Sequence, residues 1–400
     1  MKGDQHTKDL FKQLIALDKK QSFNNFFKTA LKNNKPVAMW RLPNDSEQSL
    51  IIDLTNNDLT SRLELENLPE GFLFSPFDLD SDPLFIQADI KISTLDAEVH
   101  LNPLKEFPSA FIDDFIGDTA ENGYYIPETV ADIRETTKAN YLELVRKAID
   151  CISNKEFQKV VPAKAKIIQF PEPFNPVSLF QNLCDKYPRT FVSLVSIPKI
   201  GTWIGATPEL LLSVDRNNIF TTASLAGTQL YNPDIEIQDI PWTQKEIEEQ
   251  AMVSRFIINC FKTIRLREFD EIGPRTIIAG NLAHLKTIFE VDMSATDFYD
   301  LGSVMLKLLH PTSAVCGLPK DPSYNFIKAQ ENFDRQFFSG YLGPINSKNN
   351  TSIFVNLRCM QLLNKFGIAY SGAGVTAYSN PEKEWEETEM KCATLLRVLG

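Results

Sequence analysis

The chain lacks the side chains and spacings that several common kinds of site require. Its 400 residues contain four histidines and six cysteines, with no Cys-x-x-Cys pair and no histidine at zinc-ligand spacing. This pattern gives no support to a zinc site. Scattered cysteines of this kind are typical of reduced, packed thiols, and we therefore expect a cytoplasmic protein.

Positive charge is also scarce, because the net charge at pH 7 is −11. We therefore expect no nucleic-acid partner and no anionic membrane surface as a partner. An anionic ligand would need a local basic patch or a metal ion. Residues 1–20 alternate charged and apolar side chains without a continuous apolar run, which predicts an amphipathic helix rather than a signal peptide or a membrane span.

Apolar residues are abundant, at 43% of the chain with 28 phenylalanines, and can form a large core. Short apolar runs between turn residues predict strands. The early runs cover residues 37–40, 50–54, 71–74 and 84–90. Apolar periodicity predicts one long helix over residues 127–154.

An acidic stretch near the C-terminus predicts another helix. Asn380 is a favourable N-cap and Pro381 suits the first helical position. Glu384, Glu387 and Lys391 then share one helix face, because residues three and four apart are neighbours. Most such clusters are solvated faces, since acidic side chains favour any helix N-terminus.

A second cluster of the same form opens a helix at residue 243. Thr243 and Glu246 have the spacing of a capping box, whereas Glu249 has no such structural role. Two carboxylate faces that meet across a cleft could hold Mg²⁺, which takes one or two carboxylates and fills its other positions with water and substrate oxygens. The hypothesis places Glu249 and Glu387 in contact with Mg²⁺, with Glu246 and Glu384 behind them.

Residues 157–170 predict a strand that Pro162 confines to a sheet edge or a bulge. We expect Lys164 and Lys166 to point to water on its polar face. Lys159 could be solvated in the same way. Alternatively it faces inward, where desolvation favours the neutral amine and makes it a usable base.

Residues 201–214 and 219–225, separated by an Asp-Arg-Asn-Asn turn, predict a hairpin. Glu209 lies in it between Pro208 and a Leu triplet. A carboxyl in apolar surroundings tends to keep its proton near neutral pH, which suits a general acid. The alternative is an exposed residue on a half-buried strand.

Eight short motifs follow one another over residues 131–400. They are Lys159-Val-Val, Gly205-Ala-Thr-Pro-Glu209, Ala226-Gly-Thr228, Lys245-Glu-x-x-Glu249, His310-Pro-Thr-x-Ala-Val-Cys-Gly317, Leu357-Arg-Cys359, Ser371-Gly-Ala-Gly374 and Glu384-Trp-x-Glu387. In this order they resemble the motifs of the chorismate-utilising enzymes. That family includes isochorismate, salicylate, anthranilate and aminodeoxychorismate synthases.

Three positions resemble the branch of the family that adds water. Lys159 stands where anthranilate synthases have Gln, and Ala226 where aminodeoxychorismate synthases carry a nucleophilic Lys. The sequence Leu309-His-Pro-Thr is similar to that of isochorismate synthases. The resemblance implies a Mg²⁺-dependent isomerase that converts chorismate to isochorismate. The alternatives are a salicylate synthase, which also eliminates pyruvate, and a non-catalytic chorismate-binding protein.

The resemblance also implies roles for individual residues. Lys159 would act as the base on water, and Glu209 as the acid on the departing C4 hydroxyl. Mg²⁺ on Glu249 and Glu387 would bind the ring carboxylate, and Arg358 would pair with the other carboxylate.

Further substrate contacts follow from the same resemblance. They involve Gly227, Thr228, His310, Gly372, Gly374 and Lys391. The glycines at 372 and 374 would let backbone N–H groups approach the ligand, unless they form an ordinary strand-end turn. His310 could instead be a packed core histidine.

The sequence departs from the family at some positions. Pro162 and Lys164 stand in a segment that typically reads Val-Val-Leu-x-Arg, and Gln250 replaces a His. Phe338 replaces a Tyr that contacts substrate in several relatives. Glu331 and Arg335 have the spacing of a helix ion pair.

The fold that the resemblance implies is α/β (α+β), a large two-sheet, mainly antiparallel β-sandwich flanked by helices. Residues 1–130 would be a variable N-terminal part of this sandwich, and residues 131–400 the chorismate-binding catalytic region, in one structural unit. We expect a monomer with no glutaminase subunit. The sequence leaves open whether the product serves menaquinone or siderophore biosynthesis.

Overall fold

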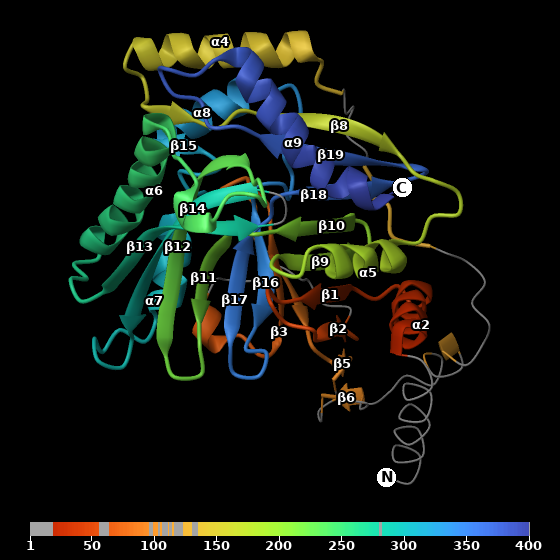
Figure 1. The fold of residues 1–400 in the computed structure, drawn as a ribbon. Helices are drawn as coiled ribbons and strands as arrows, with labels where there is room; N and C mark the ends of the chain where they lie inside the picture. Colours follow the sequence, from red (N-terminus) through yellow and green to blue (C-terminus); the bar gives the residue numbers. More distant parts are fainter. Residues whose placement is uncertain are drawn as a thin grey trace.

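The computed structural model describes residues 19–55, 64–95, 99–102, 105, 111, 114–115, 123–129, 135–279 and 282–399. Two large antiparallel sheets form the centre of the molecule, with helices outside them (Figure 1). Residues 1–18 of the predicted amphipathic helix lie outside the described residues. Within the described ranges, no helix is long and apolar enough to cross a membrane.

The first sheet has the strand order β6-β5-β2-β1-β9-β10-β18-β19-β8. Its strands are β1 (Val37–Arg41), β2 (Gln48–Ile52), β5 (Ile90–Ser93), β6 (Val99–Leu101), β8 (Ala163–Gln169), β9 (Phe191–Ile197), β10 (Gly201–Thr207), β18 (Cys359–Leu363) and β19 (Phe366–Gly372).

The second sheet has the order β13-β14-β12-β11-β17-β16-β3-β4. Its strands are β3 (Gly71–Ser75), β4 (Leu84–Gln87), β11 (Leu210–Val214), β12 (Ile219–Leu230), β13 (Asp270–Ala279), β14 (Leu282–Asp292), β16 (Tyr341–Ile345) and β17 (Thr351–Val355). A small ribbon pairs β7 (Lys159–Val160) with β15 (Gly317–Leu318). The predicted two-sheet antiparallel fold is thereby confirmed.

Helices cover the outer faces of both sheets. On the first sheet these are α2 (Lys19–Lys32), α5 (Pro176–Lys186) and α9 (Pro381–Leu399), and on the second α6 (Gln244–Thr263) and α7 (Leu301–Leu309). A separate apolar cluster joins α4 (Lys138–Ser153) to α8 (Lys320–Gln330) and to Trp385 of α9. Two 3-10 turns, η1 (Leu65–Asn67) and η2 (Ile237–Asp239), complete the described elements.

Large aromatic side chains fill the space between the sheets. Trp40 of β1 contacts Phe72 of β3 with ring centroids 5.4 Å apart, and Phe191 of β9 stacks on Phe354 of β17 at 4.2 Å. Each of these pairs joins one sheet to the other. Buried aromatic rings contribute large apolar areas to a core. The N-terminal strands take part fully, because β1 pairs with β9 and β3 with β16. The predicted boundary at residue 130 lies outside the described residues.

The chain crosses between the sheets at two places that matter for function. After β10 it passes through Pro208 and Glu209 into β11 of the other sheet. In the predicted hairpin over residues 201–225 the first strand is therefore wrong, because β10 belongs to the other sheet. The second part is right, since β11 and β12 pair as a hairpin. The second crossing runs from β17 to β18 through Leu357 and Arg358. In Figure 1 the strands of one sheet run across the view and those of the other run vertically.

Some predicted boundaries are wrong for local reasons. The long helix does not include residues 127–129 or 135–137, because Thr137 caps α4 by accepting a hydrogen bond from Asn140 N at 3.2 Å. The run 84–90 divides into β4 and β5. The strand 157–170 divides into β7 and β8 at Pro162, which has no N–H to donate, and β8 is an edge strand as predicted.

The predicted exposure of Lys164 is also wrong, whereas Lys166 is half-buried, with 28% of its side chain exposed. Lys164 is only 1% exposed, because α9 packs over this face. Its Nζ contacts Glu389 and lies 3.6 Å from the centre of the Trp385 ring. Lys166 Nζ bonds the other oxygen of Glu389 at 2.7 Å. The two lysines therefore fasten α9 to β8.

Candidate active site

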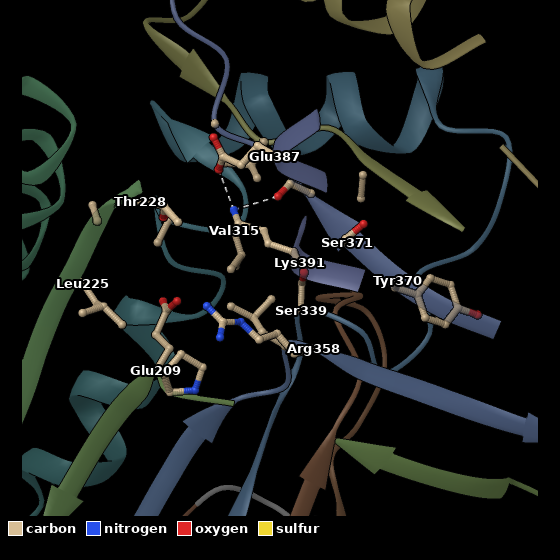
Figure 2. A pocket seen from close by; sticks show the side chains of 18 of the residues that line it. Glu209, Leu225, Thr228, Val315, Ser339, Arg358, Tyr370, Ser371, Glu387 and Lys391 are labelled. Carbon is tan, nitrogen blue, oxygen red and sulfur yellow. Dashed lines mark hydrogen bonds and ion pairs between the residues drawn. The ribbon is translucent and has the colours of Figure 1, made fainter. Parts of the chain in front are cut away.

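A cleft of about 780 Å³, counted to its open mouth, lies beside the two crossings (Figure 2). The predicted site residues that line it are Glu209, Gly227, Thr228, Glu249, Arg358, Gly372, Gly374, Glu387 and Lys391. They come from both sheets, from α6 and from α9, so the fold brings together residues far apart in sequence.

Lys159 faces inward, which is one of the two alternatives that the sequence left open. Its side chain is 0% exposed, and its Nζ lies 2.8 Å from Glu249 Oε1. The Ser323 hydroxyl donates to Lys159 O at 2.9 Å and fixes the main chain. A Cβ at Gly374 would lie 2.7 Å from Glu249 Oε1 and 3.0 Å from Lys159 Cε. Gly374 therefore gives room to this ion pair.

Glu209 occupies the first crossing and is 8% exposed. Burial raises the pKa of its carboxyl to about 7, although the positive charges of Lys391, Lys159 and Arg358 act in the opposite direction. Both the protonated and the ionised forms are therefore populated near neutral pH. A carboxyl in this state can donate a proton to a leaving group.

Arg358 occupies the second crossing and is 7% exposed, with a φ of +49°. A non-glycine residue in the left-handed region is uncommon and often marks a functional position. Arg358 Nη2 lies 3.3 Å from His284 Nε2. Burial lowers the pKa of Arg358 to about 10, so the guanidinium remains positive at neutral pH. Figure 2 shows it beside Glu209 in the cleft.

His284 of β14 lines the cleft and was not predicted. Its Nδ1 lies 3.0 Å from Gly227 O, so a proton on Nδ1 donates to that carbonyl and Nε2 accepts from Arg358. Burial, and then the charge of Arg358, lower the pKa of His284 to about 3. The neutral imidazole thus orients the guanidinium. Nothing in the local sequence set His284 apart, because the same strand also contains Lys286, Thr287 and Glu290.

Lys391 and Glu387 lie on the cleft side of α9. Lys391 Nζ is 2.8 Å from Glu387 Oε1 and donates to Gly372 O at 3.0 Å (Figure 2). The predicted N-cap is confirmed, because Asn380 Oδ1 accepts from the backbone N–H groups of residues 382 and 383. The helix start thus fixes the direction of the acidic face.

Glu384 lies behind Glu387 and is 1% exposed. Lys245 Nζ donates to its Oε1 at 2.8 Å, whereas its Oε2 is buried without a hydrogen-bond partner. Burial raises the pKa of Glu384. Glu246 does not line the cleft, because it forms the predicted capping box with Thr243, whose N–H donates to Glu246 Oε2 at 2.6 Å.

The described residues contain no cluster of three or more His, Cys, Asp or Glu arranged to hold a metal ion. Glu249 and Glu387 nevertheless both line the cleft, and each uses one oxygen for a lysine. Two carboxylates completed by water and substrate oxygens are a ligand set that Mg²⁺ accepts. The unpartnered Oε2 of Glu384 adds a buried acceptor beside them. The donor chemistry therefore fits Mg²⁺.

The structure does not bring His310 to the cleft. Its ring lies against Tyr341 with centroids 4.8 Å apart, and its Nε2 is buried without a partner. Burial lowers the pKa of His310 to about 3. His310 is half-buried and its ring packs against β16, which is closer to the packed histidine than to a ligand contact.

Glu331 and Arg335 form an ion pair, but not along a helix as predicted. Glu331 is the C-cap of α8, and Arg335 lies in the loop that follows. Arg335 also donates to Val315 O at 2.9 Å and to Val161 O at 2.7 Å, while Ala163 N–H donates to Glu331 at 2.8 Å. The pair thus ties together two loops of the cleft wall.

Comparison with known proteins agrees with this arrangement. Residues 104–400 match the family model described as "Chorismate binding enzyme". Isochorismate synthase EntC of Escherichia coli is 28% identical over 269 residues, which are 66% of this chain and 68% of the relative. Isochorismate synthase DhbC of Bacillus subtilis is 28% identical over 272 residues, 65% of this chain and 68% of the relative.

The fold is similar to two solved structures. MenF, the menaquinone-specific isochorismate synthase from Escherichia coli, has a TM-score of 0.72 at 21% identity, over 94% of this chain and 91% of that one. Anthranilate synthase component I from Streptococcus pneumoniae has a TM-score of 0.64 at 17% identity, over 90% and 92%. The fold is thus shared between branches with different chemistry. With nearly three quarters of its length matched to the family model, the chain belongs to the chorismate binding enzyme family.

Proposed function

We propose that the protein is an isochorismate synthase that isomerises chorismate to isochorismate. The observation that carries the proposal is a buried lysine, Lys159, held at 2.8 Å by the cleft residue Glu249, together with a buried carboxyl of raised pKa, Glu209, that lines the same cleft. The names of the similar relatives support it, since EntC and DhbC are both isochorismate synthases.

In the proposed reaction, Lys159 takes a proton from water, whose oxygen bonds to C2 of the substrate. The ring double bonds shift, and the C4 hydroxyl takes a proton from Glu209 and leaves as water. One water enters and one leaves, so the product is an isomer. Because a protonated amine cannot act as a base, Lys159 must give up its proton before the attack.

The cleft has features that suit a substrate with two carboxylates. Arg358 has no carboxylate ion pair among the described residues, so it can pair with one of them. Glu249 and Glu387 would hold Mg²⁺, with Glu384 behind them and Glu246 farther out. The ion would supply positive charge for the other carboxylate. Lys391, Thr228 and the backbone at Gly227 and Gly372 would complete the contacts.

The test is the product profile of the purified protein with chorismate and Mg²⁺. Isochorismate alone, abolished by chelation of the metal and by Lys159→Ala, supports the proposal. Salicylate with pyruvate would instead identify a salicylate synthase. Absence of turnover, even with ammonia added, would leave a chorismate-binding protein.

We further propose that the enzyme acts as a cytoplasmic monomer without a glutaminase subunit. The cleft supports the monomer, because residues of this chain supply the base, the acid and the metal-side carboxylates. Light scattering of the active protein at working concentration should give the mass of one 45.3 kDa chain. A dimer mass would contradict it.

A further inference from the structure

Each carboxylate assigned to Mg²⁺ contact already has a lysine partner. Lys159 pairs with Glu249 and Lys391 with Glu387, both at 2.8 Å. Lys245 pairs with Glu384 behind them, also at 2.8 Å. The ammonium of Lys245 interacts with Glu387 and Glu249 as well. The acidic cluster therefore holds positive charge of its own before any ion binds.

Lys245 differs from the other two lysines in its surroundings. Its side chain is 36% exposed, against 24% for Lys391 and 0% for Lys159. It belongs to the first turn of α6, and it does not line the cleft. Lys245 can therefore move into water when another cation arrives, which Lys159 cannot do without leaving the protein interior.

Glu384 provides a second, independent observation. It is 1% exposed, and its Oε2 is buried with no hydrogen-bond partner, although Oε1 accepts from Lys245. A buried acceptor left unsatisfied is costly, and a nearby cation or its bound water would relieve this cost. Lys245 therefore satisfies only one of the two oxygens of Glu384, and the other oxygen stays available to a cation or to its bound water.

We propose that Lys245 is an internal counter-ion that competes with Mg²⁺ for this carboxylate cluster and so sets the affinity of the protein for the metal. The inference rests on the metal site of the proposed function. Its physical basis is that Lys245 repels an arriving cation and also lowers the negative charge that attracts one. Removal of this positive charge should therefore strengthen Mg²⁺ binding.

The experiment is calorimetric titration of Mg²⁺ into the protein without substrate. Lys245→Met should bind Mg²⁺ on the order of tenfold more tightly than the wild type, whereas Lys245→Arg, which keeps the charge, should not. The matched control is Lys138→Met. It removes an exposed ion pair with Glu382 of the same helix α9, at 2.6 Å, and should leave the affinity unchanged.

Thermal unfolding gives a second readout. Mg²⁺ should raise the Tm of Lys245→Met more than that of the wild type, because the ion restores a partner to a buried carboxylate. If Lys245→Met does not fold, Lys245→Gln serves as the neutral variant. Unchanged or weaker Mg²⁺ affinity in the neutral variant, or no binding in either protein, overturns the inference. Tighter Mg²⁺ binding by the neutral variant, in a protein that does not turn over chorismate, would support the inference and refute the proposed reaction.

Discussion

Lys159 Nζ and Glu249 Oε1 form an ion pair of 2.8 Å between β7 and α6, in which the side chain of Lys159 has no exposed surface and that of Glu249 is 20% exposed. The pair holds the candidate base against a carboxylate of the candidate metal site. It therefore couples two roles, since a change at either residue alters the charge around the other.

The room for this pair comes from Gly374, which gives the first prediction. A Cβ there would approach Glu249 and Lys159 to 3.0 Å or less. Gly374→Ala should cost about 1–3 kcal/mol of unfolding free energy by overpacking. It should also lower kcat on the order of tenfold or more by displacing Lys159. Gly123→Ala is the control, because a Cβ there meets nothing within 4 Å. Equal activity of the two variants would refute the role of Gly374.

The pKa of Glu209 gives a prediction about pH. As the acid, Glu209 must be protonated, so kcat/KM should fall as pH rises through about 7. Glu209→Gln should lower kcat by about 10²–10⁴-fold. If kcat/KM instead fell only far above pH 8, another group would be the acid.

The stability of the protein tests the same pKa independently of turnover. The folded pKa of about 7 lies above the ordinary value of 4.5, so the folded state binds more protons between these two values. The wild type should therefore lose stability relative to Glu209→Gln as pH rises from 4.5 to 7, with no further loss above that. Denaturant unfolding at several pH values measures this difference. Parallel stability curves for the two proteins would contradict the raised pKa.

The buried pair of Glu331 and Arg335 gives a structural prediction. Arg335→Met leaves a buried carboxylate and two carbonyls without their partner, and should cost about 3–5 kcal/mol. Because Arg335 fixes Val161 and Val315 of the cleft wall, Arg335→Lys should lower kcat more than it raises KM. Lys328→Met, which removes an exposed pair with Asp78, is the control. A rise in KM alone would instead indicate a direct substrate contact.

Local sequence signals predicted the elements that depend on neighbours in the chain. The N-cap of α9, the capping box of α6 and the shared face of Glu384, Glu387 and Lys391 follow from helix geometry alone. The fold was predicted from the resemblance to a family, because apolar runs in the sequence do not show the order in which strands pair in a sheet.

The errors arose where tertiary contacts decide the outcome. Lys164 occupies a polar strand position, yet α9 covers it and supplies Glu389 and Trp385 as partners. The first strand of the predicted hairpin was wrong because Pro208 and Glu209, which follow β10, lead into the other sheet. His284 was missed because its partners, Gly227 and Arg358, are distant in sequence. None of these contacts leaves a periodic pattern.

The most direct test of the central claim is the origin of the new hydroxyl. The reaction should be run in H₂¹⁸O with chorismate and Mg²⁺, and the product analysed by mass spectrometry. The account predicts isochorismate with one ¹⁸O, located at C2, and no such product from Lys159→Ala. Isochorismate without ¹⁸O would mean that the hydroxyl migrates within the substrate, which would contradict the roles of Lys159 as base and Glu209 as acid.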